Sequence, residues 1–200
     1  MAARDDEHKR FYIVRHGLTK KPGVLLGQFD AGLSAEGSLQ ARVIAGEFAH
    51  EGIERIISSR LARARETACW IARPLGLDVD TDDRLNEITY GRWDGMTWEQ
   101  IEQIDPEIAR QKLENWWSAI PPGAESGTAF VGRVEQAWNS LIDHPATATV
   151  VVAHEAVNAV LEELARRRPG NSNEAWQPDW QRISNFRQQP GAYHKLSVEV

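Results

Sequence analysis

Three short apolar runs, each followed by a helical pattern, constrain the fold of this chain most strongly. The runs are β-branched or aromatic in character, as expected of buried strands, and they cover residues 11–14, 55–58 and 147–153. Apolar residues recur at the helical period over 35–50, 60–73, 127–143 and 157–164. Strands that alternate with helices predict parallel βαβ units. We therefore expect a three-layer α/β/α fold with a mostly parallel central sheet.

Local signals add detail to this expected fold. Pro74 is expected to stop the helix over 60–73 because its ring does not fit a helix interior. The helix after the third strand is expected to end near 169–170. The C-terminal segment predicts a β-hairpin in which 185–188 and alternating residues up to Val200 flank a turn at 190–191. The apolar side of the first helix is expected to contain Leu39, Val43 and Phe48.

Residues 88–125 depart from the strand–helix alternation. Thr97 and Gln100 have the spacing of a capping box, and an Asp105–Pro106 pair predicts a second helix start. The segment is rich in tryptophan, with Trp93, Trp98, Trp116 and Trp117. We expect one domain over 1–200 with a small helical cap insertion at about 88–125. Packing within the cap is the favoured role for the last two tryptophans, and lining a substrate pocket is the alternative.

The composition limits which binding partners and which cell compartment we expect for this chain. The 200 residues include 23 basic and 29 acidic side chains, for a net charge of −6, so broad attraction to nucleic acid or anionic membranes is not expected. The single Cys69 excludes an intramolecular disulfide and a zinc site built from several thiolates. No apolar stretch approaches the length of a membrane helix, and 1–10 does not resemble a secretory signal. These features favour a cytoplasmic protein.

Side chains suited to phosphate chemistry follow each of the three expected strands. They stand in Arg15-His16-Gly17, in 59–63, which ends at Arg63, and in His154-Glu155. The carboxyl ends of parallel strands meet at one edge of a sheet, where ligands bind. Arginine offers a planar fork to phosphate oxygens, and histidine is a nucleophile near pH 7. The arrangement predicts a site that captures and transfers a phosphoryl group.

Several ordered blocks extend this pattern along the chain. They are 13–19 (IVRHGLT), 27–28 with 33–37, 58–68, 85–95, 122–126 and 151–154. In these blocks the sequence resembles the histidine phosphatase superfamily, the phosphoglycerate mutase-like proteins, over 12–200. The resemblance implies that His16 is the nucleophile that becomes phosphohistidine and that Glu87 is the proton donor. It further implies a phosphate pocket formed by Arg15, Arg63 and His154, with Gly17, Thr19 and Gln28 as further binding residues.

Physical chemistry agrees with these implied roles. Fixed cations stabilise the charge that spreads over a transferring phosphoryl group, so the scheme requires no metal or cofactor. Arg15 and Arg63 should lower the pKa of His16 and keep its imidazole neutral. A bound phosphate dianion should raise the pKa of Glu87, which can then donate a proton to the leaving group. Gly17 is expected to allow a tight turn beneath the nucleophile.

Two positions depart from the family pattern. Lys20 and Lys21 stand where many members carry a Trp-Asn pair, so that phosphate or substrate contact cannot be carried over. Glu155 stands where a small glycine is common, and a carboxylate there opposes a dianion unless it points away or pairs with a cation. We hypothesise that Glu155 lies at the pocket rim and tunes the choice of substrate.

The sequence therefore predicts a phosphomonoester hydrolase that acts on a small phosphorylated metabolite. A phosphoglycerate mutase-type phosphoryl transfer is the main alternative, and a phosphate-binding protein without turnover is a weaker one. A metal site built from His16, Glu87 and His154 is disfavoured because two arginines would repel the cation. The expected partner is a small-molecule phosphomonoester, not nucleic acid or a membrane, and a homodimer is one hypothesis for the oligomeric state.

Overall fold

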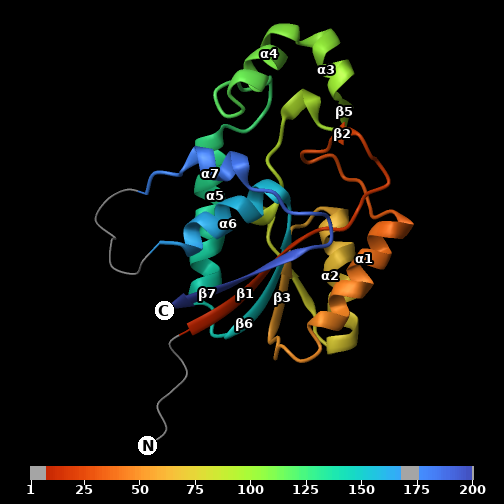
Figure 1. Ribbon diagram of the computed structural model, residues 1–200, viewed down its shortest axis with the longest axis vertical. Coiled ribbons are helices and arrows are strands. Elements are labelled where there is room, and N and C mark those ends of the chain that lie inside the picture. The colour runs from red at the N-terminus through yellow and green to blue at the C-terminus, as the bar shows by residue number, and fades with distance from the viewer. Residues whose placement is uncertain (1–7, 168–175, 200) are drawn as a thin grey trace, which may run out of the picture.

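The computed structural model describes residues 8–167 and 176–199, which form a five-stranded sheet in the order β4-β3-β6-β1-β7 (Figure 1). The strands are β1 (His8–Arg15), β3 (Arg55–Ser58), β4 (Val79–Thr81), β6 (Ala148–Ala153) and β7 (Tyr193–Glu199). Neighbouring strands are parallel except for β7, which runs antiparallel to β1. Arg15 pairs with Ala153, so β1 and β6 end side by side. The expected mostly parallel sheet is confirmed.

Helices cover both faces of this sheet, as the three-layer prediction requires (Figure 1). One face of the sheet packs on α1 (Ala35–Glu47) and α2 (Ala62–Leu75), through a core that includes Tyr12 and Val152. The other face packs on α5 (Gly127–Asp143) and α6 (Glu155–Ala165), through a core that includes Phe11 and Val151. Successive strand residues serve opposite cores because side chains alternate along a strand.

A helical insertion stands above the end of the sheet at which β1 and β6 finish (Figure 1). It contains β5 (Met96–Thr97), which pairs with β2 (Val24–Leu25), then α3 (Trp98–Ile104) and α4 (Pro106–Glu114). Two 3₁₀ turns, η1 (Asp83–Leu85) and η2 (Gly91–Trp93), lead into it. The Thr97 hydroxyl accepts from Gln100 N, and the Gln100 side chain accepts from Thr97 N, so the predicted capping box is present.

The C-terminal hairpin prediction is wrong. Of the predicted first strand, 185–188, Asn185 ends α7 (Trp180–Asn185) and the following three residues form a loop, while β7 pairs with β1, with Leu196 opposite Phe11. Strand β7 lies at the edge of the sheet and pairs with β1, which is distant in the sequence, and not with the segment just before the turn. Val200 lies outside the described residues.

Smaller differences concern the helices. Pro74 lies inside α2, which ends one residue later, where Gly76 has a φ of 65° and forms the left-handed cap. Leu39 and Val43 are exposed, because the buried side of α1 is made of small residues and Ile44. Helix α6 ends at Ala165. The end predicted for this helix, near 169–170, lies outside the described residues. Within those residues, no helix is long and apolar enough to cross a bilayer.

Candidate active site

The structure brings the principal predicted site residues together at the end of the sheet beneath the cap. Arg15 is the last residue of β1 and His16 follows it, while His154 follows β6 and is the N-cap of α6. The rings of His16 and His154 lie 5.1 Å apart, centroid to centroid. Arg63 reaches the same point from the first turn of α2.

The contacts of His16 determine which ring nitrogen carries the proton. Nδ1 lies 2.8 Å from the Gly17 carbonyl oxygen, which can only accept, so Nδ1 is protonated and donates. Nε2 lies 3.2 Å from Arg63 Nε, which can only donate, so Nε2 carries a lone pair. The pKa of His16 is lowered to about 3, first by burial and then by Arg63 and Arg15. His16 is therefore neutral, with an unprotonated Nε2.

Arg63 is 1% exposed and all three guanidinium nitrogens have partners. Besides His16, Nη1 donates to the Phe29 carbonyl at 2.9 Å and Nη2 to the Gly27 carbonyl at 2.7 Å. These bonds fix the plane of the fork next to Nε2. The sequence block that selects Arg63 is consistent with this placement, since Arg60 and Arg65 are exposed.

His154 is fully buried, and its partners assign its tautomer as well. The Asn86 side-chain oxygen accepts from Arg60 N at 3.0 Å and from the Ser59 hydroxyl at 2.8 Å. Ser59 Oγ must then accept from His154 Nε2, at 2.8 Å. Within the described residues, His154 Nδ1 is buried without a hydrogen-bond partner. Burial and Arg63 hold the pKa of His154 well below its usual value.

Glu155 pairs with an arginine, one of the two ways foreseen for a carboxylate at this position. Its Oε2 lies 3.0 Å from Arg15 Nη1, and its Oε1 accepts from Gln188 N at 3.1 Å. The Gln188 carbonyl accepts from Arg15 Nη1 as well, and the buried Gln188 amide donates to the Ile13 carbonyl at 2.9 Å. Among the described residues, Arg15 Nε has no partner and remains a free donor.

Glu87 lies in the loop after η1, where its backbone is held from two sides. Its carbonyl accepts from the Gln28 amide at 3.0 Å and from Arg133 Nη2 at 3.1 Å. Its Oε1 accepts from Ile88 N at 3.0 Å. Burial raises the pKa of Glu87, against the opposing effect of Ile88 N and Arg63. A raised pKa suits a proton donor. Gln28, predicted to bind substrate, holds the loop that carries Glu87.

The remaining predicted residues have other surroundings. The Gly17 backbone packs against α1, and a Cβ at Gly17 would lie 2.4 Å from the Gly37 carbonyl oxygen. Close approach, and not a tight turn, therefore explains the glycine. The Thr19 hydroxyl lies 3.4 Å from Lys21 N and O in its own loop, and Lys20 and Lys21 are exposed.

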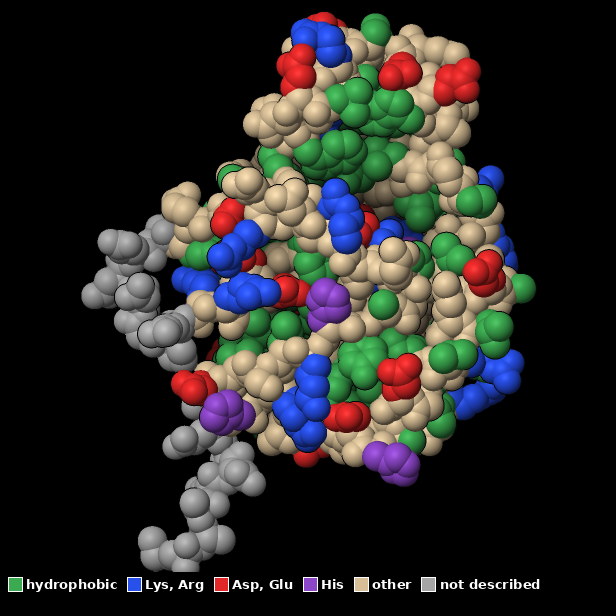
Figure 2. Space-filling view, viewed as in Figure 1, with side chains coloured by type: hydrophobic (Ala, Val, Ile, Leu, Met, Phe, Trp, Pro, Cys, Tyr) green, Lys and Arg blue, Asp and Glu red, His purple; other side chains and the backbone are tan. Residues whose placement is uncertain are grey.

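A cavity of about 390 Å³ adjoins Glu87 and Glu155 beneath the cap. Figure 2 shows apolar side chains gathered on the underside of the cap, above charged side chains of the sheet body. The described residues that line the cavity are Leu25, Glu87, Tyr90, Trp116, Trp117, Glu155, Ala156, Ile183, Ser184, Phe186 and Arg187. Trp116 and Trp117 thus belong to a pocket wall, the less favoured of the two predictions.

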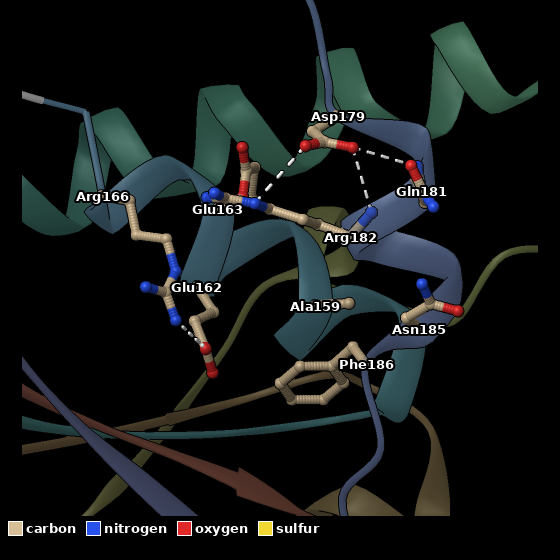
Figure 3. A pocket seen from close by; sticks show the side chains of 9 residues that line it. All are labelled: Ala159, Glu162, Glu163, Arg166, Asp179, Gln181, Arg182, Asn185 and Phe186. Carbon is tan, nitrogen blue, oxygen red and sulfur yellow. Dashed lines mark hydrogen bonds and ion pairs between the residues drawn. The ribbon is translucent and has the colours of Figure 1, made fainter.

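A second cavity, between α6 and α7, is lined by charged side chains that pair with one another (Figure 3). Arg166 pairs with Glu162, and Arg182 pairs with Glu163 and Asp179. None of the predicted site residues lines it. Across the described part of the chain, no group of three or more His, Cys, Asp or Glu is arranged to hold a metal ion.

Sequence reasoning missed several residues that organise the site. Ser59 and Asn86 lie inside the recognised blocks, so their positions could have been examined as partners of His154. Gln188 gave no signal, because it acts on Arg15 and Glu155 through backbone atoms. Arg187 and Phe186 come from the loop after α7, which was expected to be a strand.

Comparison with known proteins identifies relatives for about three quarters of the chain. A bifunctional protein of Mycobacterium tuberculosis is 37% identical over 160 residues, which cover 78% of this chain and 44% of that protein. The chain thus spans under half the length of this relative. Phosphoserine phosphatase 1 of Hydrogenobacter thermophilus is 32% identical over 150 residues, covering 74% and 71%. A protein of Yersinia pestis named "probable phosphoglycerate mutase" is 32% identical over 146 residues, covering 72% and 68%.

Solved structures agree with the fold. The mycobacterial glucosyl-3-phosphoglycerate phosphatase matches with a TM-score of 0.79 at 27% identity, covering 95% of this chain and 90% of that one. The alpha-ribazole phosphatase of Shigella flexneri matches with a TM-score of 0.81, covering 96% and 94%, and at 24% identity it supports the fold alone. The family model of the histidine phosphatase superfamily (branch 1) matches residues 11–198, and the chain belongs to that superfamily.

Proposed function

We propose that the protein hydrolyses phosphomonoesters of small metabolites through a phosphohistidine at His16. One observation carries this proposal: His16 Nε2 is unprotonated and accepts a hydrogen bond from Arg63 Nε at 3.2 Å. A phosphate oxygen that takes over this donor frees the Nε2 lone pair for attack. A nucleophile next to a fixed cation is what attack on a phosphoryl group needs. Relatives named as phosphatases support the hydrolytic direction.

The first chemical step forms a bond between His16 Nε2 and phosphorus while the bond from phosphorus to the ester oxygen breaks. Arg15 and Arg63 hold the equatorial oxygens, and His154 contributes a donor once the bound dianion restores its proton. Glu87, whose pKa is raised by burial, gives its proton to the departing alkoxide.

The second step hydrolyses phosphohistidine. The Glu87 carboxylate takes a proton from water as the water oxygen bonds to phosphorus. The P–N bond breaks, its electron pair returns to Nε2, and inorganic phosphate leaves. Glu87 is then protonated again and ready for the next ester. The two arginines supply the positive charge in both steps, so the proposal needs no metal or cofactor. We further propose that the reaction takes place in the cytoplasm.

Phosphoryl transfer between two hydroxyls is the second candidate function. It uses the same residues, and the relative named as a phosphoglycerate mutase favours it. The two functions differ in the acceptor that attacks phosphohistidine. Incubation with 3-phosphoglycerate and a trace of its bisphosphate separates them, since a mutase forms the isomer faster than it releases phosphate.

The test of the main proposal is hydrolysis of 4-nitrophenyl phosphate in the presence of EDTA, with vanadate as inhibitor. We expect turnover in EDTA, inhibition by vanadate, and loss of activity in His16→Ala. Activity that depends on added metal, or that survives His16→Ala, contradicts the mechanism. A His16→Ala protein with an unchanged thermal unfolding midpoint excludes misfolding as the cause of lost activity.

A further inference from the structure

The cavity beside the proposed phosphate site has an aromatic wall, which is unusual for a pocket that binds a small carboxylic acid. Four aromatic rings line it: Tyr90, Trp116, Trp117 and Phe186. Tyr90 and Trp116 come from the cap region, and Phe186 comes from the loop after α7. Glu87, the proposed proton donor, lines the same cavity, so the alcohol part of a bound ester lies among these rings.

The charges around the cavity disfavour an anionic alcohol part. Glu87 and Glu155 both contribute carboxyl groups to the lining. Of the described lining residues, Arg187 alone is cationic, and it is exposed and donates to the Ser184 and Phe186 carbonyls. Arg15 does not line this cavity, and it is paired with Glu155 at 3.0 Å. A substrate carboxylate would therefore find no buried cation among the described lining residues, and it would lie near the Glu155 carboxylate.

Trp117 is held in place by its own contacts. Its ring stacks on Phe130, with centroids 6.2 Å apart and planes at 16°, and it packs on Trp180 at 4.8 Å. Its Nε1 donates to Ser184 Oγ at 2.7 Å. A ring fixed in this way loses little conformational freedom when a ligand binds against it.

A buried lysine, Lys112, contacts Trp116 and acts as a brace that holds its ring in place. Lys112 is 5% exposed, its ammonium lies 5.0 Å from the Trp116 ring centroid and 5.8 Å from that of Tyr90, and it donates to the Trp116 carbonyl. Lys112 does not line the cavity, so it acts on the wall and not on a ligand. Trp98 stacks on Trp116 as well, at 6.4 Å and 26°.

From this wall we propose, on the basis of the proposed function, that the preferred substrates are phosphomonoesters whose alcohol part is an uncharged ring system. The ring binds against Trp116 and Trp117 while the phosphoryl group occupies the site at His16. Aromatic faces favour flat apolar partners and give such a ring an affinity that a small carboxylic acid lacks. Phosphorylated amino acids and phosphoglycerates are then poor substrates.

Three esters of primary alcohols test the proposal: benzyl phosphate, glycerol phosphate and phosphoserine. Their leaving groups have similar intrinsic reactivity, so differences report recognition. We expect kcat/KM for benzyl phosphate to exceed that for phosphoserine by about tenfold or more, mainly through KM. Equal values, or a preference for phosphoserine, overturn the inference. Absence of His16-dependent hydrolysis of all three esters instead overturns the proposed function on which it rests.

Variants locate the preference in the wall. We expect Trp116→Leu and Trp117→Leu to raise KM for benzyl phosphate by about tenfold and to change values for phosphoserine by no more than about twofold. Lys112→Met, which removes the brace, should have a smaller effect in the same direction. The matched control is Trp70→Leu, a tryptophan of α2 that contacts Arg42 and Arg73 and does not line the cavity. Unchanged KM values in both wall variants overturn the inference.

A measurement on the unaltered protein avoids any folding defect of the variants. Benzylphosphonate and methylphosphonate share the phosphoryl group and differ by the ring. We expect benzylphosphonate to inhibit competitively at a concentration about tenfold lower. Equal inhibition by the two compounds contradicts a ring-binding wall.

Discussion

Replacement of Arg63 by lysine keeps the positive charge and removes the guanidinium fork. In the protein, the three fork nitrogens bond to the Gly27 carbonyl, the Phe29 carbonyl and His16 Nε2. A lysine ammonium is a single donor atom on a shorter stem, and it cannot reach three acceptors spread along a plane. Arg63→Lys therefore separates the role of charge from the role of geometry.

The loss of stability follows from the orphaned acceptors. The Gly27 carbonyl bond is buried, and an acceptor left buried without a donor costs about 1–3 kcal/mol. The Phe29 carbonyl lies nearer the surface, where water can replace the donor. For a chain of this size, we expect the thermal unfolding midpoint to fall by roughly 2–10 °C. Differential scanning calorimetry measures this change.

We expect kcat of Arg63→Lys to fall by more than partial unfolding of the variant could cause. Removal of one oriented donor from a developing anionic charge costs about 100- to 1,000-fold in kcat. Steady-state kinetics with 4-nitrophenyl phosphate, well below the unfolding midpoint, measures the effect. The matched control is Arg65→Lys, two residues along the same helix and exposed. Wild-type kcat in Arg63→Lys, or an equal loss in Arg65→Lys, refutes the reasoning.

Three further predictions concern the acid, the brace and the loop beneath the nucleophile. Glu87→Gln should slow cleavage of benzyl phosphate in the first turnover about 100- to 10,000-fold and affect the first-turnover release of 4-nitrophenolate much less, because that anion leaves without a proton; single-turnover kinetics compares the two esters. Burial lowers the pKa of Lys112 to about 8, so the unfolded chain binds a proton between pH 8 and 10 that the folded chain has lost. The free energy of unfolding of the wild type should therefore rise by about 1–3 kcal/mol over this range, and Lys112→Met should lack that rise; urea unfolding across pH measures it. Gly37→Ala should destabilise the protein by more than about 2 kcal/mol in the same assay, because its Cβ would lie 2.0 Å from the Leu18 carbonyl oxygen.

Local patterns predicted the parts of the fold that depend on near neighbours along the chain. The apolar runs became β1, β3 and β6, and the capping box at Thr97 formed as expected. The pairing of β7 with β1 joins residues far apart in sequence, and no local pattern contains that information. The burial of α1 was misjudged because the helix packs through small residues such as Ala41 and Ala45, where close approach matters more than hydrophobicity.

The same holds for the site: features that depend on near neighbours in the sequence could be predicted, and contacts between distant segments could not. Arg15 ends β1, and His16 and His154 directly follow β1 and β6, so the three could be predicted to converge. Their tautomers and orientations depend on partners from other loops. Ser59 orients His154 through its hydroxyl. Gln188 positions Arg15 through a backbone carbonyl, which any residue type possesses, so its identity carries no signal.

The most direct test of the central claim is to trap phosphate on His16. In Glu87→Gln, 4-nitrophenyl phosphate should still phosphorylate the enzyme, while hydrolysis of the intermediate lacks its base. We predict a burst of about one nitrophenolate per chain, and a phosphoryl group on His16 that is stable in alkali and lost in acid. His16→Ala in the same background should abolish both. Linear product release with no label on His16, or a label that resists acid, contradicts the account.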